Sequence, residues 1–121
     1  MVLLRMRFVV PEELSTDFER EIIDNYGPAL ERQDGFHAWR LLKPYSAEVL
    51  TALGTSSDGF DWDLEFEFES EPARLAWVAS ADHTTVLEAV RSITQEIRYC
   101  GYDLVARDGG LEAAAQGASS S

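Results

Sequence analysis

Two ring side chains that could take part in a reaction, a tryptophan and a histidine, lie six residues apart in the second half of the chain. They are Trp77 and His83, at the end of the stretch Glu69–His83. An imidazole with a pKa near ~6.5 can take up a phenolic or enolic proton and return it, so His83 is the candidate general base. Its place at a helix start after Ser80 disfavours the protonated form and keeps the base available. The alternative interpretation is a histidine that only packs or caps there.

Trp77 is out of phase with the apolar pair Leu75 and Val78 by roughly a third of a helical turn. It therefore either lines a separate cavity or covers the helix junction. Core packing accounts for it slightly better, because a large aromatic ring is mostly hydrophobic contact area. Tyr26, next to Gly27, offers a phenol to the same cavity, although most such tyrosines only pack.

The composition is that of one acidic globular domain. Its 121 residues are 45% hydrophobic and carry 10 basic against 22 acidic side chains, a formal charge of −12. This charge repels phosphate backbones and anionic lipid, so neither nucleic acid nor a membrane is an expected partner. No apolar run has the length of a membrane span, and Met1–Val10 is too short for a signal peptide. The predicted location is the cytoplasm.

Cysteine and histidine usage argues against a metal centre. Cys100 is the single cysteine, which excludes an internal disulfide framework and a cysteine-based zinc site. The two histidines lack metal-ligand spacing, so neither a metal nor another cofactor is predicted. Cys100 ends an apolar helical stripe and is interpreted as a small core or boundary residue.

Alternation of apolar residues predicts the strands. They are expected over Val2–Val10, Phe36–Lys43, Asp61–Glu69 and Tyr102–Arg107. The third is the clearest, with aromatic and aliphatic residues on one face and carboxylates on the other. The second is apolar on both faces, which leaves its orientation open and is typical of a strand between two layers or at an interface.

The helix signals lie between these strands. A capping box at Thr16 and Glu19 opens the first helix, which Gly27-Pro28 is expected to kink or break. Ser70 and Ser80 are predicted N-caps of two later helices. The apolar stripe of the last helix is expected to continue to near Gly101.

The connection 44–60 is long for a hairpin loop. Ser46–Leu53 is expected to form a short helix in it, capped by Ser46 and ended by Gly54. Such a loop is often a lid, or it is a family-specific insertion.

The order β-α-β-β-α-β predicts an α+β, ferredoxin-like fold, in which a four-stranded antiparallel sheet has helices on one face. In that fold the first and third strands are neighbours, which sets Arg5 and Arg7 on the same face as Glu65 and Glu67. Residues 1–108 are the expected domain and 109–121 a disordered tail, because the end of the chain is low-complexity.

On these residues the chain resembles the dimeric α+β barrel superfamily. Asp34-Gly35-Phe36 opens the second strand as in that superfamily, and Phe66–His83 is similar to the antibiotic biosynthesis monooxygenase group within it. The resemblance covers roughly Leu3–Arg107. It implies a homodimer joined through the sheets, and a cavity between sheet and helices for a small hydrophobic aromatic molecule. Several members oxidise polyketide-derived phenols with O₂ and without metal or flavin, whereas others close polyketide rings.

The resemblance can be compared at individual positions of the chain. Trp77 matches the tryptophan that faces the cavity in quinone-forming monooxygenases. Those enzymes carry an Asn four residues before it and a Tyr six after, where this chain has Ala73 and His83. An aromatic followed at six by histidine also resembles olivetolic-acid-type cyclases, in which tyrosine and histidine form an acid/base pair. Trp77 has no acidic proton for that role.

The predicted function is therefore cofactor-independent oxygenation of a polyketide-like phenolic substrate. His83 and Trp77 are the predicted catalytic residues, and the predicted substrate-binding residues are Tyr26, Phe66 and Phe8. A ring-closing cyclase with His83 as base is the first alternative. A non-catalytic dimer that binds a ligand or regulates a partner is the second.

Overall fold

The computed structural model describes residues 1–108, and the predicted tail 109–121 lies outside the described residues. The strands form one antiparallel sheet in the order β2-β3-β1-β4. Their bounds are β1 Val2–Val9, β2 Phe36–Leu42, β3 Trp62–Phe68 and β4 Glu96–Asp103. This is the predicted α+β, ferredoxin-like architecture.

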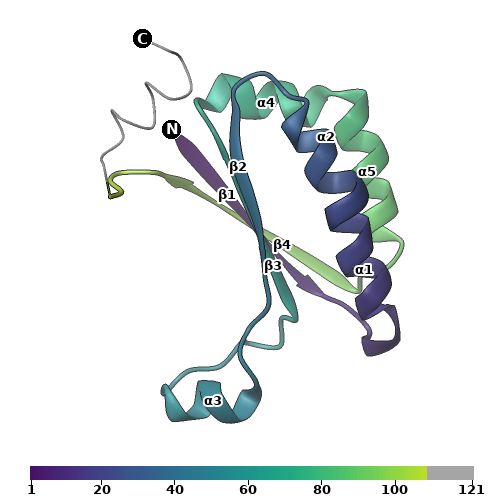
Figure 1. Ribbon diagram of the computed structural model, residues 1–121, viewed down its shortest axis with the longest axis vertical. Coiled ribbons are helices and arrows are strands. Elements are labelled where there is room, and N and C mark those ends of the chain that lie inside the picture. The colour runs from purple at the N-terminus through teal and green to yellow at the C-terminus, as the bar shows by residue number, and fades with distance from the viewer. Residues whose placement is uncertain (109–121) are drawn as a thin grey trace.

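The helices pack on one face of this sheet and leave the other face open (Figure 1). The first helical segment comprises a 3₁₀ turn η1 Glu12–Leu14, α1 Ser15–Glu21, a π-helical stretch η2 Ile22–Tyr26 and α2 Gly27–Glu31. The second comprises α4 Glu71–Ala79 and α5 Ala81–Arg91. A separate short helix, α3 Ala47–Ala52, connects β2 to β3.

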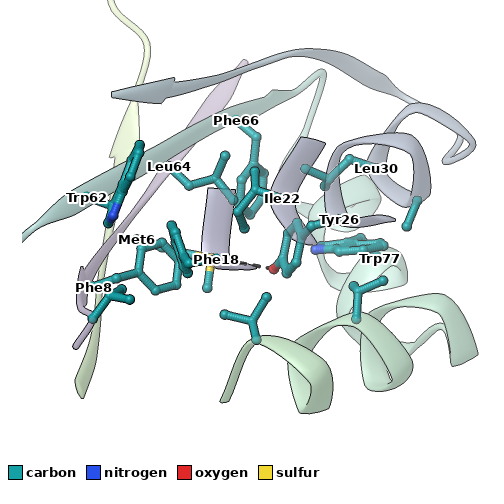
Figure 2. Close-up of a cluster of buried hydrophobic side chains, with 14 of the residues drawn as sticks. Met6, Phe8, Phe18, Ile22, Tyr26, Leu30, Trp62, Leu64, Phe66 and Trp77 are labelled. Atoms are coloured by element: carbon teal, nitrogen blue, oxygen red, sulfur yellow. Dashed lines mark hydrogen bonds between the residues drawn. The ribbon is translucent and has the colours of Figure 1, made fainter. Parts of the chain in front are cut away.

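The two central strands supply the floor of the core. Met6 and Phe8 of β1 pair with Leu64 and Trp62 of β3, and all four side chains are buried under the helices. Alternation puts every second residue of each strand on this face. Figure 2 shows these side chains meeting Phe18 of α1.

The open face carries the predicted charge ladder. Arg5 pairs across the strands with Glu65, and Arg40 of β2 binds the same carboxylate from the other side, with N–O distances of 2.7 Å and 2.6 Å. Arg107 pairs with Glu67. Glu65 and Glu67 are buried even on this uncovered face because arginine side chains lie across them.

The start of the first helix differs from the prediction. No side chain caps α1, whose N-cap position is Leu14 rather than Thr16. The 3₁₀ turn after Pro11 satisfies the Leu14 amide instead, through a 2.9 Å bond to the Pro11 carbonyl. A preceding turn thus replaces the capping box.

Pro28 disturbs the first helix without ending it. A proline cannot donate to the carbonyl four residues earlier, here that of Asp24. The preceding turn adopts π geometry over Ile22–Tyr26, and α2 continues directly. A glycine is required at position 27 for a separate reason, because a Cβ there would lie 2.4 Å from the Trp39 ring. Glycine therefore permits the close contact between this helix and β2.

A β-bulge resolves the orientation of β2. The register shifts between Phe36 and Ala38, so that Phe36 pairs with Phe68 and Trp39 pairs with Phe66. An extra residue in one strand moves its side chains to the opposite face. Phe36 and Trp39 both pack against the core as a result.

The last helix is shorter than predicted. Val86 and Val90 are buried as expected, but α5 ends at Arg91 and β4 begins at Glu96, well before the expected Tyr102. Pairing along the whole of β4 satisfies backbone groups on the edge of β1 that a longer helix would leave without a partner. The interpretation of Cys100 was wrong for the same reason, since it is an exposed strand residue.

The connection between β2 and β3 follows its prediction. Ser46 caps α3 by accepting a hydrogen bond from the Val49 amide, and Gly54 follows the helix with a φ of 78°. Within residues 1–108, no helix has the length and apolar character needed to cross a membrane.

Candidate functional site at the junction of α4 and α5

Ser80 fixes the junction that holds the predicted catalytic pair. Its Oγ accepts a 3.1 Å hydrogen bond from the His83 amide and donates a 2.7 Å bond to the Trp77 carbonyl. One hydroxyl thus caps α5 and closes the last turn of α4. Ser70 caps α4 in the same way, through the Ala73 amide. Both predicted N-caps are confirmed. The Ser80 hydroxyl connects the backbone of Trp77 directly to that of His83.

The junction places the two rings edge to face. The centroids of Trp77 and His83 are 5.1 Å apart with an interplanar angle of 81°. Trp77 also meets Tyr26 edge-on at 5.8 Å, and the Tyr26 hydroxyl donates to the Met6 sulfur at 3.4 Å. Figure 2 shows Tyr26 between Trp77 and Met6 within the core.

The aromatic residues predicted to contact substrate are sealed. Phe8, Tyr26, Phe66 and Trp77 have exposed fractions of 0 to 1%. A side chain that lined a ligand-sized cavity would keep surface accessible to water, so these rings pack within the hydrophobic core and not around a space. Trp77 therefore covers the helix junction, while Leu75 and Val78 point outward. Substrate contact by the four rings remains a prediction that requires the core to open.

Tyr26 is poorly suited to proton exchange where it lies. Burial, with a smaller contribution from Tyr99, raises the pKa of its phenol well above the usual range. Its hydroxyl donates a hydrogen bond to the thioether of Met6. The residue acts here as a core aromatic that supports Trp77.

His83 differs because its ring reaches a surface hollow of about 430 Å³. The walls come from one turn of α4 and the outer side of α5, namely Val78, His83, Thr84, Leu87, Glu88 and Arg91. The hollow is as large as a small ligand pocket. Val78 and Leu87 supply apolar walls, and His83 and Arg91 supply the groups capable of acid/base and anion chemistry.

The surroundings of His83 favour the neutral imidazole. Burial is the main cause that lowers its pKa, the positive charge of Arg91 lowers it further, and a hydrogen bond with the Val78 backbone opposes the shift. The predicted effect of the helix start has the same direction. A neutral ring at physiological pH is able to accept a proton.

The edge of the sheet next to α5 is incompletely covered. Register places Tyr99 and Gly101 of β4 opposite Met6 and Leu4, on the face that carries the helices, yet both are exposed. Arg91 lines the hollow beside His83 and a second one that includes Tyr99. We call the hollow beside His83, together with Arg91 and the exposed helix-facing side of β4 at Tyr99 and Gly101, the α5/β4 trough.

Arg91 and Tyr99 were not anticipated as site residues. The predicted helix ran through both positions, which hid the alternation of Ile97, Tyr99 and Gly101 against Arg98 and Cys100. That period of two was the available signal.

Within residues 1–108, no three histidine, cysteine, aspartate or glutamate side chains are arranged to hold a metal ion. His37, the other histidine, lies in the β2 bulge, and its buried Nε2 atom has no hydrogen-bond partner in the described structure.

Comparison with known proteins defines the fold more closely than the function. No family model and no curated protein matches the sequence. The structure is similar to SnoaB, a cofactor-independent oxygenase from Streptomyces nogalater, with a TM-score of 0.69 and 15% identity over 88% of this chain and 94% of that one. It is also similar to the hydroxynitrile lyase from Passiflora edulis, with a TM-score of 0.71 and 18% identity over 85% and 92%.

A third similar structure is a dimeric ferredoxin-like protein from Thermobifida fusca, with a TM-score of 0.65 and 12% identity over 85% of this chain and 90% of that one. The fold is therefore the α+β, ferredoxin-like fold that these proteins share. Proteins that share it include an oxygenase and a lyase, so the reaction must be argued from the site.

Proposed function

We propose that this protein is a small-molecule enzyme that oxidises a flat phenolic substrate with O₂ in the α5/β4 trough. The observation that carries the proposal is the position of His83, which packs edge to face with Trp77 and lines a hollow with Val78, Leu87 and Arg91. SnoaB, a similar structure, is a cofactor-independent oxygenase.

Proton transfer to His83 starts the proposed reaction. The neutral imidazole takes the proton of a phenolic or enolic hydroxyl, which leaves an electron-rich anion. Arg91 lies in the same hollow, and no ion pair within residues 1–108 involves it. Its guanidinium stabilises that anion. The favoured substrates are aromatics that carry an ionisable hydroxyl.

The oxidation balances without an external reductant. A ring methylene next to the phenolate loses its two hydrogens and gains one oxygen atom as a carbonyl. The second oxygen atom of O₂ leaves as water with those hydrogens. The substrate supplies all the electrons, so the protein contributes proton transfer, orientation and stabilisation of the anion.

A ring-closing cyclase is the second candidate. His83 would then remove a proton from a carbon acid, and the carbanion would attack a carbonyl of the same molecule with loss of water. The favouring observation is that the same neutral imidazole suffices, and a lyase shares the fold. This reaction proceeds without O₂. The third candidate, a ligand-binding or regulatory dimer, predicts binding without turnover.

Oxygen uptake with a panel of anthrones and naphthols tests these candidates. The oxygenase should consume one O₂ per quinone formed, and His83→Ala should lower the rate by about a hundredfold or more. Thr85→Ala, an exposed change on the same helix, serves as the matched control and should keep the wild-type rate. An unchanged rate in His83→Ala would remove His83 from the mechanism. Product formed under anaerobic conditions would favour the cyclase.

Gly101→Leu tests whether the trough is the binding site. A Cβ at Gly101 would meet Leu4 at 3.7 Å, an ordinary contact, so a leucine there should be tolerated. The added side chain would project from the helix-facing side of β4, on the same face as Tyr99, and would narrow the trough. We expect unchanged thermal stability and weakened substrate binding, measured by calorimetric titration. Full binding in this variant would place the ligand elsewhere.

We further propose that the enzyme is a cytoplasmic homodimer joined through the open sheet face. Half of the ten basic residues contact this face: Arg5, Arg7, Arg40, Arg98 and Arg107. They face the carboxylates of β3 and Glu96, so this surface is nearly neutral on a chain with a charge of −12. Two copies can approach there with little repulsion.

A further inference from the structure

Arg91 lines two neighbouring hollows. One is the hollow beside His83, of about 430 Å³, and the other has a volume of about 260 Å³. The second lies where the chain turns from the last residue of α5 into β4 (Figure 1). We call it the end hollow, and it is lined by Arg91, Thr94, Gln95, Glu96, Ile97 and Tyr99.

The end hollow offers hydrogen-bonding side chains that the protein itself does not use. Next to it, the Ser92 hydroxyl donates to the Ala89 carbonyl and the Arg98 guanidinium donates to Glu96. In the described part of the chain, no side-chain hydrogen bond or ion pair engages the other polar lining residues, which are Arg91, Thr94, Gln95 and Tyr99. Guanidinium, amide and hydroxyl groups all donate to an oxygen anion. A ligand can therefore bind here without breaking a bond within the protein.

The two hollows differ in the charge that accompanies Arg91. Glu88 lines the hollow beside His83, and no ion pair in the described part of the chain neutralises its carboxylate. In the end hollow the one carboxylate is Glu96, which binds Arg98 at 2.7 Å. A permanently anionic group is therefore better placed in the end hollow. The overall charge of −12 opposes an anion only at long range, because physiological salt screens charges beyond about 8 Å.

The sizes and walls of the hollows indicate a substrate of two parts. Ligand pockets commonly measure about 300–1,000 Å³, so the hollow beside His83 has room for a ring system and the end hollow for a substituent. Val78 and Leu87 give the first hollow apolar walls that fit a flat ring. The end hollow, with four free polar side chains around Ile97, fits an arm that carries oxygen atoms.

We propose that the substrate is an aromatic acid, with its phenolic ring beside His83 and a carboxylate-bearing arm in the end hollow. Arg91 binds the carboxylate, and Thr94 and Gln95 add donors from the turn after α5. A guanidinium has five N–H donors, so it holds a carboxylate with two and keeps others for the phenolate. The phenolate forms only together with the imidazolium of His83, whereas the permanent carboxylate needs the charge of Arg91. This substrate class rests on the proposed oxygenase function and adds a specificity determinant to it.

Matched substrates test the carboxylate. Oxygen uptake is measured with a hydroxyanthrone that carries a carboxylate on a side arm, and with its methyl ester. The acid should have a kcat/KM about tenfold higher, mainly through a lower KM, because hydrogen bonds between charged groups strengthen binding. Gln95→Glu adds a negative charge to the end hollow and should abolish this preference, while Gln95→Lys should increase it. Thr51→Glu adds the same charge at an exposed position of α3 and should leave the preference unchanged.

Binding without turnover separates the substrate class from the proposed reaction. Under anaerobic conditions, a hydroxynaphthoate should shift the amide NMR signals of Thr94, Gln95 and His83, and the matching naphthol only that of His83. Oxygen uptake that depends on His83 but is equal for acid and ester, with unshifted signals at Thr94 and Gln95, would overturn the aromatic acid and leave the oxygenase. Carboxylate-dependent shifts at Thr94 and Gln95 without oxygen uptake from any phenol would overturn the oxygenase and support the aromatic acid as the ligand.

Discussion

The aromatic core and the α5/β4 trough share one helix junction but differ in every physical respect. On the core side, Trp77 and Tyr26 are 1% exposed and surrounded by apolar side chains. On the trough side, His83 is partly exposed beside a hollow with Arg91. The rings of Trp77 and His83 pack edge to face, yet Trp77 is buried in the core and His83 is partly exposed. Stability and proposed chemistry are thus assigned to adjacent residues.

The comparison also changes the role that resemblance implies for Trp77. In the monooxygenases that the chain resembles, the corresponding tryptophan faces a cavity. Here it is only 1% exposed, and Ala73 provides no polar partner one turn before it. The Trp77 ring packs edge to face against the imidazole of His83, with the centroids 5.1 Å apart.

The largest expected effect is on the core side. Trp77→Ala should lower the free energy of unfolding by about 3–5 kcal/mol, because it leaves a large cavity among close-packed rings. Denaturant unfolding measures this loss. Leu75→Ala, at an exposed position of the same helix, should change it by less than about 0.5 kcal/mol. Equal effects of the two substitutions would show that Trp77 is not part of a sealed core.

A smaller loss of stability is expected at the contact between the first helix and β2. Gly27→Val would force side-chain atoms into the Trp39 ring, where even a Cβ lies only 2.4 Å away. Overpacking of this kind costs about 1–3 kcal/mol. The thermal midpoint should fall, and the added change Trp39→Ala should recover part of the loss. No recovery in the double variant would show that the two residues are not in conflict.

Removing the junction hydroxyl should have a modest effect on stability and a distinct one on function. Ser80→Ala deletes a helix cap, which costs about 1 kcal/mol. Ser70→Ala deletes the equivalent cap of α4 and should cost a similar amount. Only Ser80→Ala should also lower turnover, because its hydroxyl joins the turn that carries Trp77 to the amide of His83. Equal turnover in the two variants would show that the Ser80 hydroxyl stabilises the helix without contributing to the proposed reaction.

The smallest expected effect is a shift in pH dependence. A general base must be neutral to act, and burial together with Arg91 lowers the pKa of His83 below its usual value near ~6.5. The rate should therefore persist below that pH and fall as the imidazole becomes protonated. Arg91→Leu removes one cause of the lowered pKa, so the acidic limb of the rate profile should move to higher pH. A profile that moves to lower pH would contradict this assignment.

Local patterns accounted for most of the framework. The alternation of Trp62, Leu64 and Phe66 marks a half-buried strand whatever its neighbours are. Ser70 and Ser80 cap helices because a hydroxyl needs only the amide three residues later. The pairing of Arg5 with Glu65 followed once the strand order was set by the element sequence.

Long-range pairing decided what the local patterns left open or misassigned. The face of β2 depended on the bulge at His37, which appears only when the strand is aligned with β3. The start of β4 depended on hydrogen bonds to β1, far away in the sequence, and these prevailed over a helical stripe that ended near Cys100.

The sequence by itself determined the order of the elements, the caps at Ser46, Ser70 and Ser80, and the nearness of Trp77 to His83, because each depends on residues close together along the chain. Only the tertiary structure decided that Trp77 is sealed, that His83 opens to a hollow and that Tyr99 and Arg91 border it. Burial and access depend on which distant segments pack over a side chain, and at this junction the core covers one ring while the edge of the sheet leaves the other uncovered.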